Sequence, residues 1–274
     1  MSFATTSSAS LRELTLAAAG AAVFGLPVLM TMEMWELGSS TYPLRLALFL
    51  ALSVPLLTGL SYYSGARDGF DWQDDVVDAF VALAVGAAVS LLVLTLCNVL
   101  DWAEDTPRAL IGKVALQAVT AAMGAVLARE QFGQQSGEQQ RQKREAGYFG
   151  ALFLMAAGAL FLAFNLAPTE EMVLIAYMMT PWHGIALVLA SVAVLHGFVY
   201  EVGFYGQDER RTASFWDLFL RYSVVGYAVT FLVSAYILWT FGRLDGLGPA
   251  TAVMAVVVLA FPGAVGAASA RLVL

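Results

Sequence analysis

The stretch "TEEMVLIAYMMTP" (residues 169–181) separates two long apolar runs, and "TMEMWELGSSTYP" (31–43) does the same earlier in the chain. Both stretches begin with Thr-x-Glu-Met and reach a proline at the same spacing. Proline lacks a backbone donor and clashes with the preceding turn, so neither stretch forms one straight helix. We therefore predict helix breaks at Pro43 and Pro181, at corresponding places in the two halves.

The similarity extends outward from these stretches. Residues 16–62 align without a gap on residues 154–200, and 14 of the 47 aligned positions are identical. The shift is 138 residues, and it grows to 140 for Gly86 with Gly226 and to 142 for Gly124 with Gly266. Membrane segments resemble one another by composition, but composition alone does not align a Glu, a Thr and a Pro at one offset. We interpret the chain as a tandem duplication.

Composition indicates the class of protein. The 274 residues are 59% hydrophobic and 13% charged, whereas soluble domains are about half apolar and a quarter charged. A helix needs about 20 apolar residues to cross about 30 Å of hydrocarbon. The apolar runs that meet this length predict an all-α polytopic transmembrane helix bundle of about eight spans, near residues 11–31, 43–63, 76–100, 107–128, 147–167, 181–201, 214–240 and 249–270.

The predicted organisation is four spans plus four. Residues 1–128 form the first transmembrane repeat, the Gln-rich segment 129–146 is a cytoplasmic linker, and residues 147–274 form the second repeat. An even number of spans gives both copies the same orientation, which predicts a parallel repeat about an axis along the membrane normal. Arg and Lys concentrate on the side of the linker, so the positive-inside rule places both termini in the cytoplasm and the two acidic stretches outside.

The duplicated carboxylates are the main candidate site. Glu33 and Glu171 align in the repeat, and Glu36 and Glu170 lie beside them. Helix interruptions at matching positions of two halves are typical of transport sites, where freed backbone groups contact an ion. A simpler interpretation is that Thr31 and Thr169 cap short helices whose dipoles Glu33 and Glu171 complement. The sequence leaves both interpretations open.

Other polar residues are candidates at the same side. Lys113 lies within the fourth span with Gln117 one turn later, and it either extends to the outer interface or pairs with Glu33, Glu36 or Glu171. His183 could join Glu170 and Glu171 at a divalent ion such as Mn²⁺, but no ligand spacing supports this, so a metal site stays unknown.

Several function classes find no support in the residues. The chain has no Gly-x-Ser-x-Gly, no His-Glu-x-x-His and no phosphate-binding Gly-rich loop with Lys, so we expect neither an enzyme nor a cofactor. The net charge of −7 includes no basic tract for nucleic acid.

The Ala-rich first span with its copy, the Glu33 and Glu171 segments and the turn Pro181-Trp182-His183-Gly184 resemble a family of bacterial multi-span integral membrane proteins of unknown function. The resemblance implies the bacterial inner membrane and a small single-span protein as partner, and it supplies no activity.

We expect an ion transport protein, a channel or a proton-coupled transporter, most simply for cations. Its partners would be the lipid bilayer, an inorganic cation or proton, and a second copy of the chain. The alternative is a scaffold or sensor that binds a single-span partner through small-residue faces such as "AAAGAA" (17–22) and "GAVGAASA" (263–270).

Overall fold

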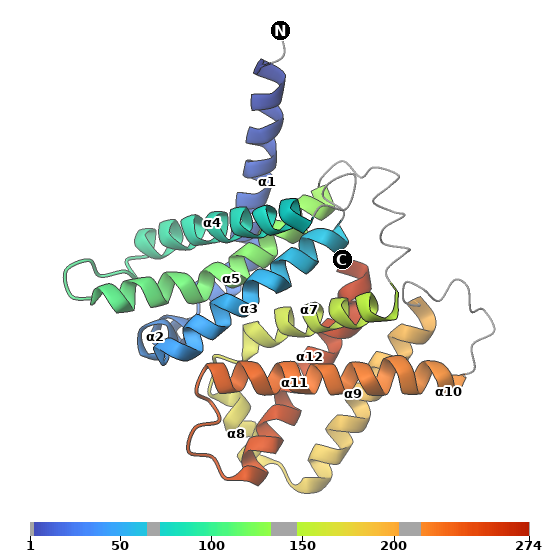
Figure 1. The fold of residues 1–274 in the computed structure, drawn as a ribbon. Helices are drawn as coiled ribbons and strands as arrows, with labels where there is room; N and C mark the ends of the chain where they lie inside the picture. Colours follow the sequence, from blue (N-terminus) through green and yellow to red (C-terminus); the bar gives the residue numbers. More distant parts are fainter. Residues whose placement is uncertain (1–2, 65–71, 133–146, 203–214, 274) are drawn as a thin grey trace. The chain divides into compact units, whose positions relative to one another are not determined.

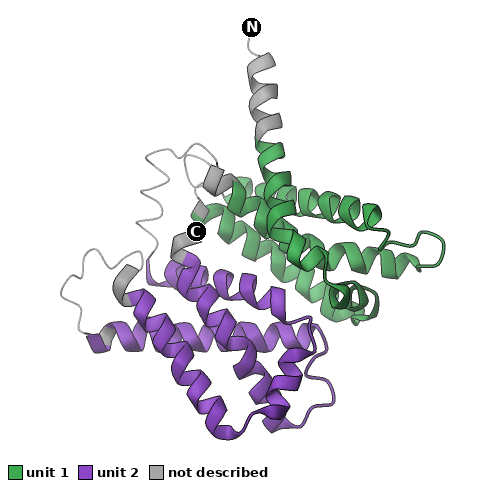
Figure 2. Cartoon of the chain, turned by 180° about the vertical axis from the view of Figure 1, so that it is seen from behind, with its two compact units in different colours: residues 1–142 green, residues 143–274 purple. Residues whose placement is uncertain are grey.

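The computed structural model describes residues 3–64, 72–132, 147–202 and 215–273. These residues form helices joined by short connections, and no strand occurs among them. They belong to two compact units, residues 1–142 and 143–274 (Figure 2). The boundary between the units falls in the predicted linker 129–146, most of which lies outside the described residues.

In unit 1, one helix packs against all the others (Figure 1). This central helix is α5. Of its most apolar 18-residue stretch, 72% is buried, against 28% of the corresponding stretches of α3 and α4. Its neighbours α3 and α4 therefore leave most of their apolar surface on the outside of the unit, as lipid-facing helices do. The helices of unit 1 are α1 (Phe3–Leu29), α2 (Met32–Ser40), α3 (Pro43–Ser64), α4 (Trp72–Leu96) and α5 (Pro107–Phe132).

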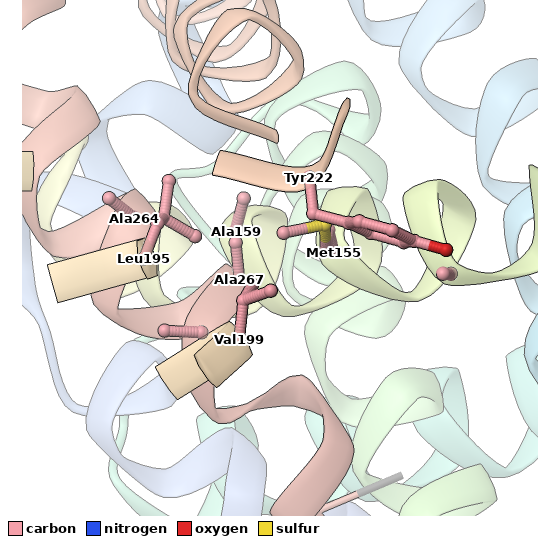
Figure 3. Packing of buried hydrophobic residues seen from close by; sticks show 9 residues of the cluster. Met155, Ala159, Leu195, Val199, Tyr222, Ala264 and Ala267 are labelled. Atoms are coloured by element: carbon pink, nitrogen blue, oxygen red, sulfur yellow. The ribbon is translucent and has the colours of Figure 1, made fainter. Parts of the chain in front are cut away.

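Unit 2 is arranged around its last helix, α12. Met155, Leu195 and Ala264, which come from three different helices, meet in its apolar core, and Tyr222 joins them from a π-helix (Figure 3). The helices of unit 2 are α7 (Tyr148–Leu166), α8 (Glu171–Met178), α9 (Pro181–Val202), α10 (Phe215–Leu218), the π-helix η1 (Phe219–Val224), α11 (Val225–Thr240) and α12 (Pro249–Val273).

The two units share an order of elements: a long helix, a short helix, and then three longer helical segments of which the last is central. Two residues separate the end of each short helix from a proline, and α3 and α9 begin at Pro43 and Pro181, where the sequence predicted breaks. Proline suits the first position of a helix, because the N–H that it lacks has no partner inside the helix there. The duplication itself stays a prediction from the sequence.

The helices meet the expectation of a transmembrane bundle. Seven described helices are long and apolar enough to cross a membrane. An eighth candidate combines α1 and α2, which are bent by 87° at a break between Leu29 and Met32. The predicted all-helical polytopic fold with about eight spans is therefore confirmed.

In each unit two glycines bring the backbones of two long helices into contact. A Cβ built at Gly124 of α5 would lie 2.6 Å from the carbonyl oxygen of Gly20 on α1, and the reverse contact is equally close. Gly158 of α7 and Gly266 of α12 approach each other in the same way. Small residues allow such backbone contact between membrane helices. The stretches 17–22 and 263–270 therefore contribute these glycines to contacts within their own units, and their use as faces for a partner stays a prediction.

We expect Gly124→Ala and Gly266→Ala each to lower the free energy of unfolding by about 1–3 kcal/mol, because the added methyl group meets backbone atoms that cannot rotate away. The measurement is reversible unfolding in mixed micelles.

Gly197→Ala is the matched control. Gly197 also lies in a helix, α9, but a Cβ there meets nothing within 4 Å. This variant should be as stable as the wild type or slightly more so, since Ala favours helix by up to about 1 kcal/mol. Equal stability of all three variants would contradict the role of the glycine contacts.

Candidate functional site

The short helices α2 and α8 carry the predicted site residues. Glu33 and Glu171 each lie in the first turn of their helix, where a carboxylate complements the helix dipole. The predicted threonine caps do not form. Thr31 occupies the N-cap position of α2, but its hydroxyl donates to the carbonyl of Pro27 in α1.

In unit 2, the N-cap residue of α8 is Glu170 instead of Thr169. The hydroxyl of Thr169 donates to the carbonyl of Leu166, 2.9 Å away. Thus each threonine hydroxyl donates to a carbonyl near the end of the helix that precedes the break, and each satisfies a carbonyl where the chain leaves that helix. The dipole part of the simpler interpretation fits the geometry, whereas its capping part was wrong.

The carboxylates of unit 2 interact with Arg243, which follows α11. Nη1 of Arg243 lies 3.3 Å from Oε1 of Glu170, and Nη2 donates to the carbonyl of Pro168. The pKa of Glu171 is held below its usual value, first by the backbone N–H of Glu171, then by the Thr169 hydroxyl, with a smaller effect of Arg243. Glu170 and Glu171 are both exposed.

Glu33 and Glu36 differ in exposure on α2. Glu33 is half-buried and Glu36 is exposed. The opposite face of α2, with Met34 and Leu37, is buried, and the backbone of Gly38 lies against the backbone of Gly112 and Lys113 on α5. This contact fixes α2 across the end of α5.

Lys113 pairs with a residue other than those predicted. Its Nζ lies 2.6 Å from Oδ2 of Asp105 and 3.1 Å from the carbonyl oxygen of Val99, both in the loop between α4 and α5. The predicted partners Glu33 and Glu36 were wrong, because this loop folds back over the start of α5, and the pairing with Glu171 stays a prediction. The hydrogen bond from Lys113 lowers the pKa of Asp105.

A turn in the same loop brings Asp105 to Lys113. Oδ1 of Asp101 accepts the backbone N–H of Ala103 at 2.9 Å and that of Glu104 at 3.1 Å. The backbone N–H of Asp101 in turn donates to Oδ2 of Asp105. Asp101, four residues before Asp105, is the sequence signal that could have identified this loop, since Asp side chains often close turns of this kind.

Gln117 is fully buried, and its amide makes no hydrogen bond to any residue that the structure describes. The same is true of the hydroxyl of Ser90 on α4 and of the hydroxyl of Thr120 on α5. Thr120 was missed by sequence reasoning, although its spacing of three residues from Gln117 places both on one side of a helix.

His183 lies apart from any metal-binding arrangement. It is exposed in the first turn of α9, and its Nδ1 lies 2.8 Å from the hydroxyl oxygen of Thr180. Within residues 3–64, 72–132, 147–202 and 215–273, no group of three or more His, Cys, Asp or Glu residues is placed to hold a metal ion. The geometry therefore gives no support to a site of His183 with Glu170 and Glu171.

The ion pair of Asp105 with Lys113 should contribute to the free energy of unfolding, and this contribution should depend on pH. Asp105→Asn leaves a partly buried ammonium group without its carboxylate, and we expect a loss of about 1–3 kcal/mol at pH 7. The folded-state pKa of Asp105 is lowered, so its contribution is present above the unfolded pKa of about 4 and lost as the pH falls through the folded value. The difference between variant and wild type should therefore disappear in acid.

Thermal unfolding in detergent from pH 7 to pH 3 measures this difference. Glu104→Gln is the control, because Glu104 is an exposed carboxylate of the same loop, and its change should stay within about 0.5 kcal/mol. A pH-independent difference for Asp105→Asn would show that the charge of Asp105 is not what stabilises the loop.

Comparison with known proteins identifies the family. No curated protein and no solved structure matches the chain. Residues 13–274 match the family described as "Putative integral membrane protein (DUF2391)", a family of unknown function. This match agrees with the resemblance read from the Glu33 and Glu171 segments, and it covers nearly the whole chain. The chain therefore belongs to this family of integral membrane proteins, with several apolar helices that lie in a lipid bilayer.

Proposed function

We propose that this membrane protein transports ions, passively or coupled to protons, and that the ions are cations. The observation that carries the proposal is the helix break beside a carboxylate in each unit. In unit 1 the chain bends by 87° before α2, with Glu33 in the first turn of α2. In unit 2 it breaks between α7 and α8, with Glu171 in the first turn of α8. Broken helices with ionisable residues are typical of transport sites.

The proposed duplication supplies the second step. If the two repeats are related by an axis along the membrane normal, Glu33 and Glu171 lie at equal depth around that axis. Two carboxylates that approach each other repel, so the pair gains by binding a cation or by sharing a proton. This exchange would couple cation binding to protonation, and Glu36 would add negative charge beside it.

Arg243 affects the two carboxylates of unit 2 differently, so Glu170 and Glu171 are not equal candidates for binding a cation. A cation at Glu170 would compete with the guanidinium 3.3 Å away, whereas the shift in the pKa of Glu171 comes mainly from its own backbone N–H and from Thr169. We therefore assign the main role to Glu171 with Glu33, and a secondary role to Glu170. His183 and Lys113 have local partners and are not assigned to the ion.

The second candidate function is a scaffold or sensor for a small single-span membrane protein. The exposure of Glu36, Glu170 and Glu171 favours it, because carboxylates in bulk solvent are hydrated and bind cations weakly. For either function we propose residence in the bacterial inner membrane with both termini in the cytoplasm, and a second copy of the chain as a partner.

The test of transport is flux of H⁺, Na⁺, K⁺, Ca²⁺ and Mn²⁺ into liposomes that contain the purified protein. We expect flux of at least one cation in the wild type and a loss of about tenfold or more in Glu33→Gln/Glu171→Gln. Glu104→Gln, which removes an exposed loop carboxylate outside α2 and α8, should retain the flux. Absence of flux for every ion would overturn the transport proposal, and full flux in the double variant would overturn the role of these carboxylates.

The proposed orientation can be tested separately by fusing reporter proteins to the chain. Green fluorescent protein after Leu274 should fluoresce, because this protein matures in the cytoplasm. Alkaline phosphatase fused after Glu104 should be active, because this enzyme needs the oxidising periplasm for its disulfides. The reverse result for both fusions would show that the chain has the opposite orientation.

A further inference from the structure

Three buried side chains in unit 1 have hydrogen-bonding groups that their surroundings do not satisfy. Ser90, Gln117 and Thr120 are each 0% exposed, and we call them the buried polar layer. The hydroxyls of Ser90 and Thr120 make no hydrogen bond to the described residues, and the amide oxygen and nitrogen of Gln117 make none either. Leaving one such group unpaired in an apolar interior costs about 1–3 kcal/mol, and most buried polar groups in proteins therefore have a partner. Three adjacent exceptions require an explanation.

The packing of α5 places Gln117 against α1. Val114, three residues before Gln117, packs against the cluster that contains Leu29 of α1. Ala121, four residues after it, lies against Gly25, one turn before Leu29. Residues three and four apart share one face of a helix, so Gln117 lies on the α1-facing side between these two contacts.

The same reasoning places Ser90 of α4 at the level of Gln117. Leu94, four residues after Ser90, belongs to the cluster with Leu29. Gly86, four residues before it, contacts the backbone of Ala118 and Ala122 on α5. Ser90 and Gln117 therefore occupy the layer directly beneath the apolar cluster of Leu29 and Leu94, and Gly25 of α1 brings no side chain into this layer.

The chemistry of these groups selects the ligand. The Gln117 amide offers two donors and one acceptor, and each hydroxyl both donates and accepts. A cation would satisfy the oxygens and leave the Gln117 donors unpaired, whereas an anion would leave the acceptor unpaired. A ligand that donates and accepts at once, and that carries no charge, matches all of them. Buried water has these properties and typically makes about three hydrogen bonds to polar groups of this kind.

We propose that the buried polar layer is a hydration site in which water molecules bridge Ser90 and Gln117 between α1, α4 and α5, and that Thr120, three residues further along α5, extends the site. The layer lies one turn, roughly 6 Å, along α5 from Lys113, whose ammonium group reaches the loop. Gln117 is therefore a ligand of neutral water rather than of a cation. This inference does not depend on ion transport, and its test uses no flux measurement.

The test compares the reactivity of two cysteines, each placed one at a time on α4. Cys97 is exposed and is first replaced by serine. Ser90→Cys and Leu94→Cys are then introduced separately, and the reaction of each with methyl methanethiosulfonate is followed by mass spectrometry in lipid nanodiscs. The two positions are one turn apart and equally buried, but Leu94 lies in an apolar cluster. The thiolate is the reactive form, and apolar surroundings suppress it.

We expect Cys at position 90 to react about tenfold or more faster than Cys at position 94. Replacing a leucine by the smaller cysteine loosens the packing at position 94 and should raise the reaction rate there. The comparison is therefore biased against the expected difference. Adding Gln117→Leu to Ser90→Cys should slow the reaction severalfold, because water then loses its main partner.

Thr120→Cys is a second probe of the same layer, for use alongside Ser90→Cys or in its place if that variant does not fold. Equal rates at positions 90, 94 and 120, or no effect of Gln117→Leu, would overturn the hydration site and would indicate that the side chains satisfy one another in a dry core. Thermal unfolding of every variant shows that the compared proteins are folded.

Discussion

A helix that lies in lipid has to satisfy its backbone N–H and C=O groups within the protein, and the arrangement of this chain depends on that requirement. Among the described residues, interruptions of the apolar runs occur where proline needs no acceptor or where a side chain binds a free backbone group. Prolines begin α3, α5, α9 and α12, where the missing donor has no intrahelical acceptor. At the breaks after α1 and α7, threonine hydroxyls donate to carbonyls of the preceding helix. The acidic stretches are thus places where the chain can turn without leaving polar backbone groups unpaired.

The second organising feature is the central helix of each unit. Hydrophobic burial does not drive helices together in lipid, so close packing and hydrogen bonds have to do so. The contacts of Gly20 with Gly124 and of Gly158 with Gly266 supply this packing. Each unit also has one polar contact of this kind, because Lys113 in unit 1 and Arg243 in unit 2 each bind a loop carbonyl and one carboxylate. In both units the basic side chain holds the adjacent loop in place.

The sequence predicts the helices and their breaks well, because length, hydropathy and proline act locally. It predicts the site less well. The partner of Lys113 depends on how the loop containing Asp105 folds back over the start of α5, and hydropathy does not specify the path of a loop. The hydroxyl of Thr31 could have capped α2 or bonded to α1, and the bend between these helices decided for α1. The small residues of α1 and α12 indicate close contact, but residue size alone does not distinguish a contact within a unit from one with a partner.

The contact between Gly20 and Gly124 also has a mechanical consequence. Backbone atoms of α1 and α5 touch there without intervening side chains, so sliding or rotating one helix against the other would drive backbone into backbone. The two helices therefore move as one body. Helix α2 follows α1 after Met30 and Thr31, and the backbone of Gly38 in α2 lies just as closely against the backbone of Gly112 and Lys113 in α5. The three helices α1, α2 and α5 therefore resist sliding against one another, and Glu33 keeps a fixed position relative to the start of α5.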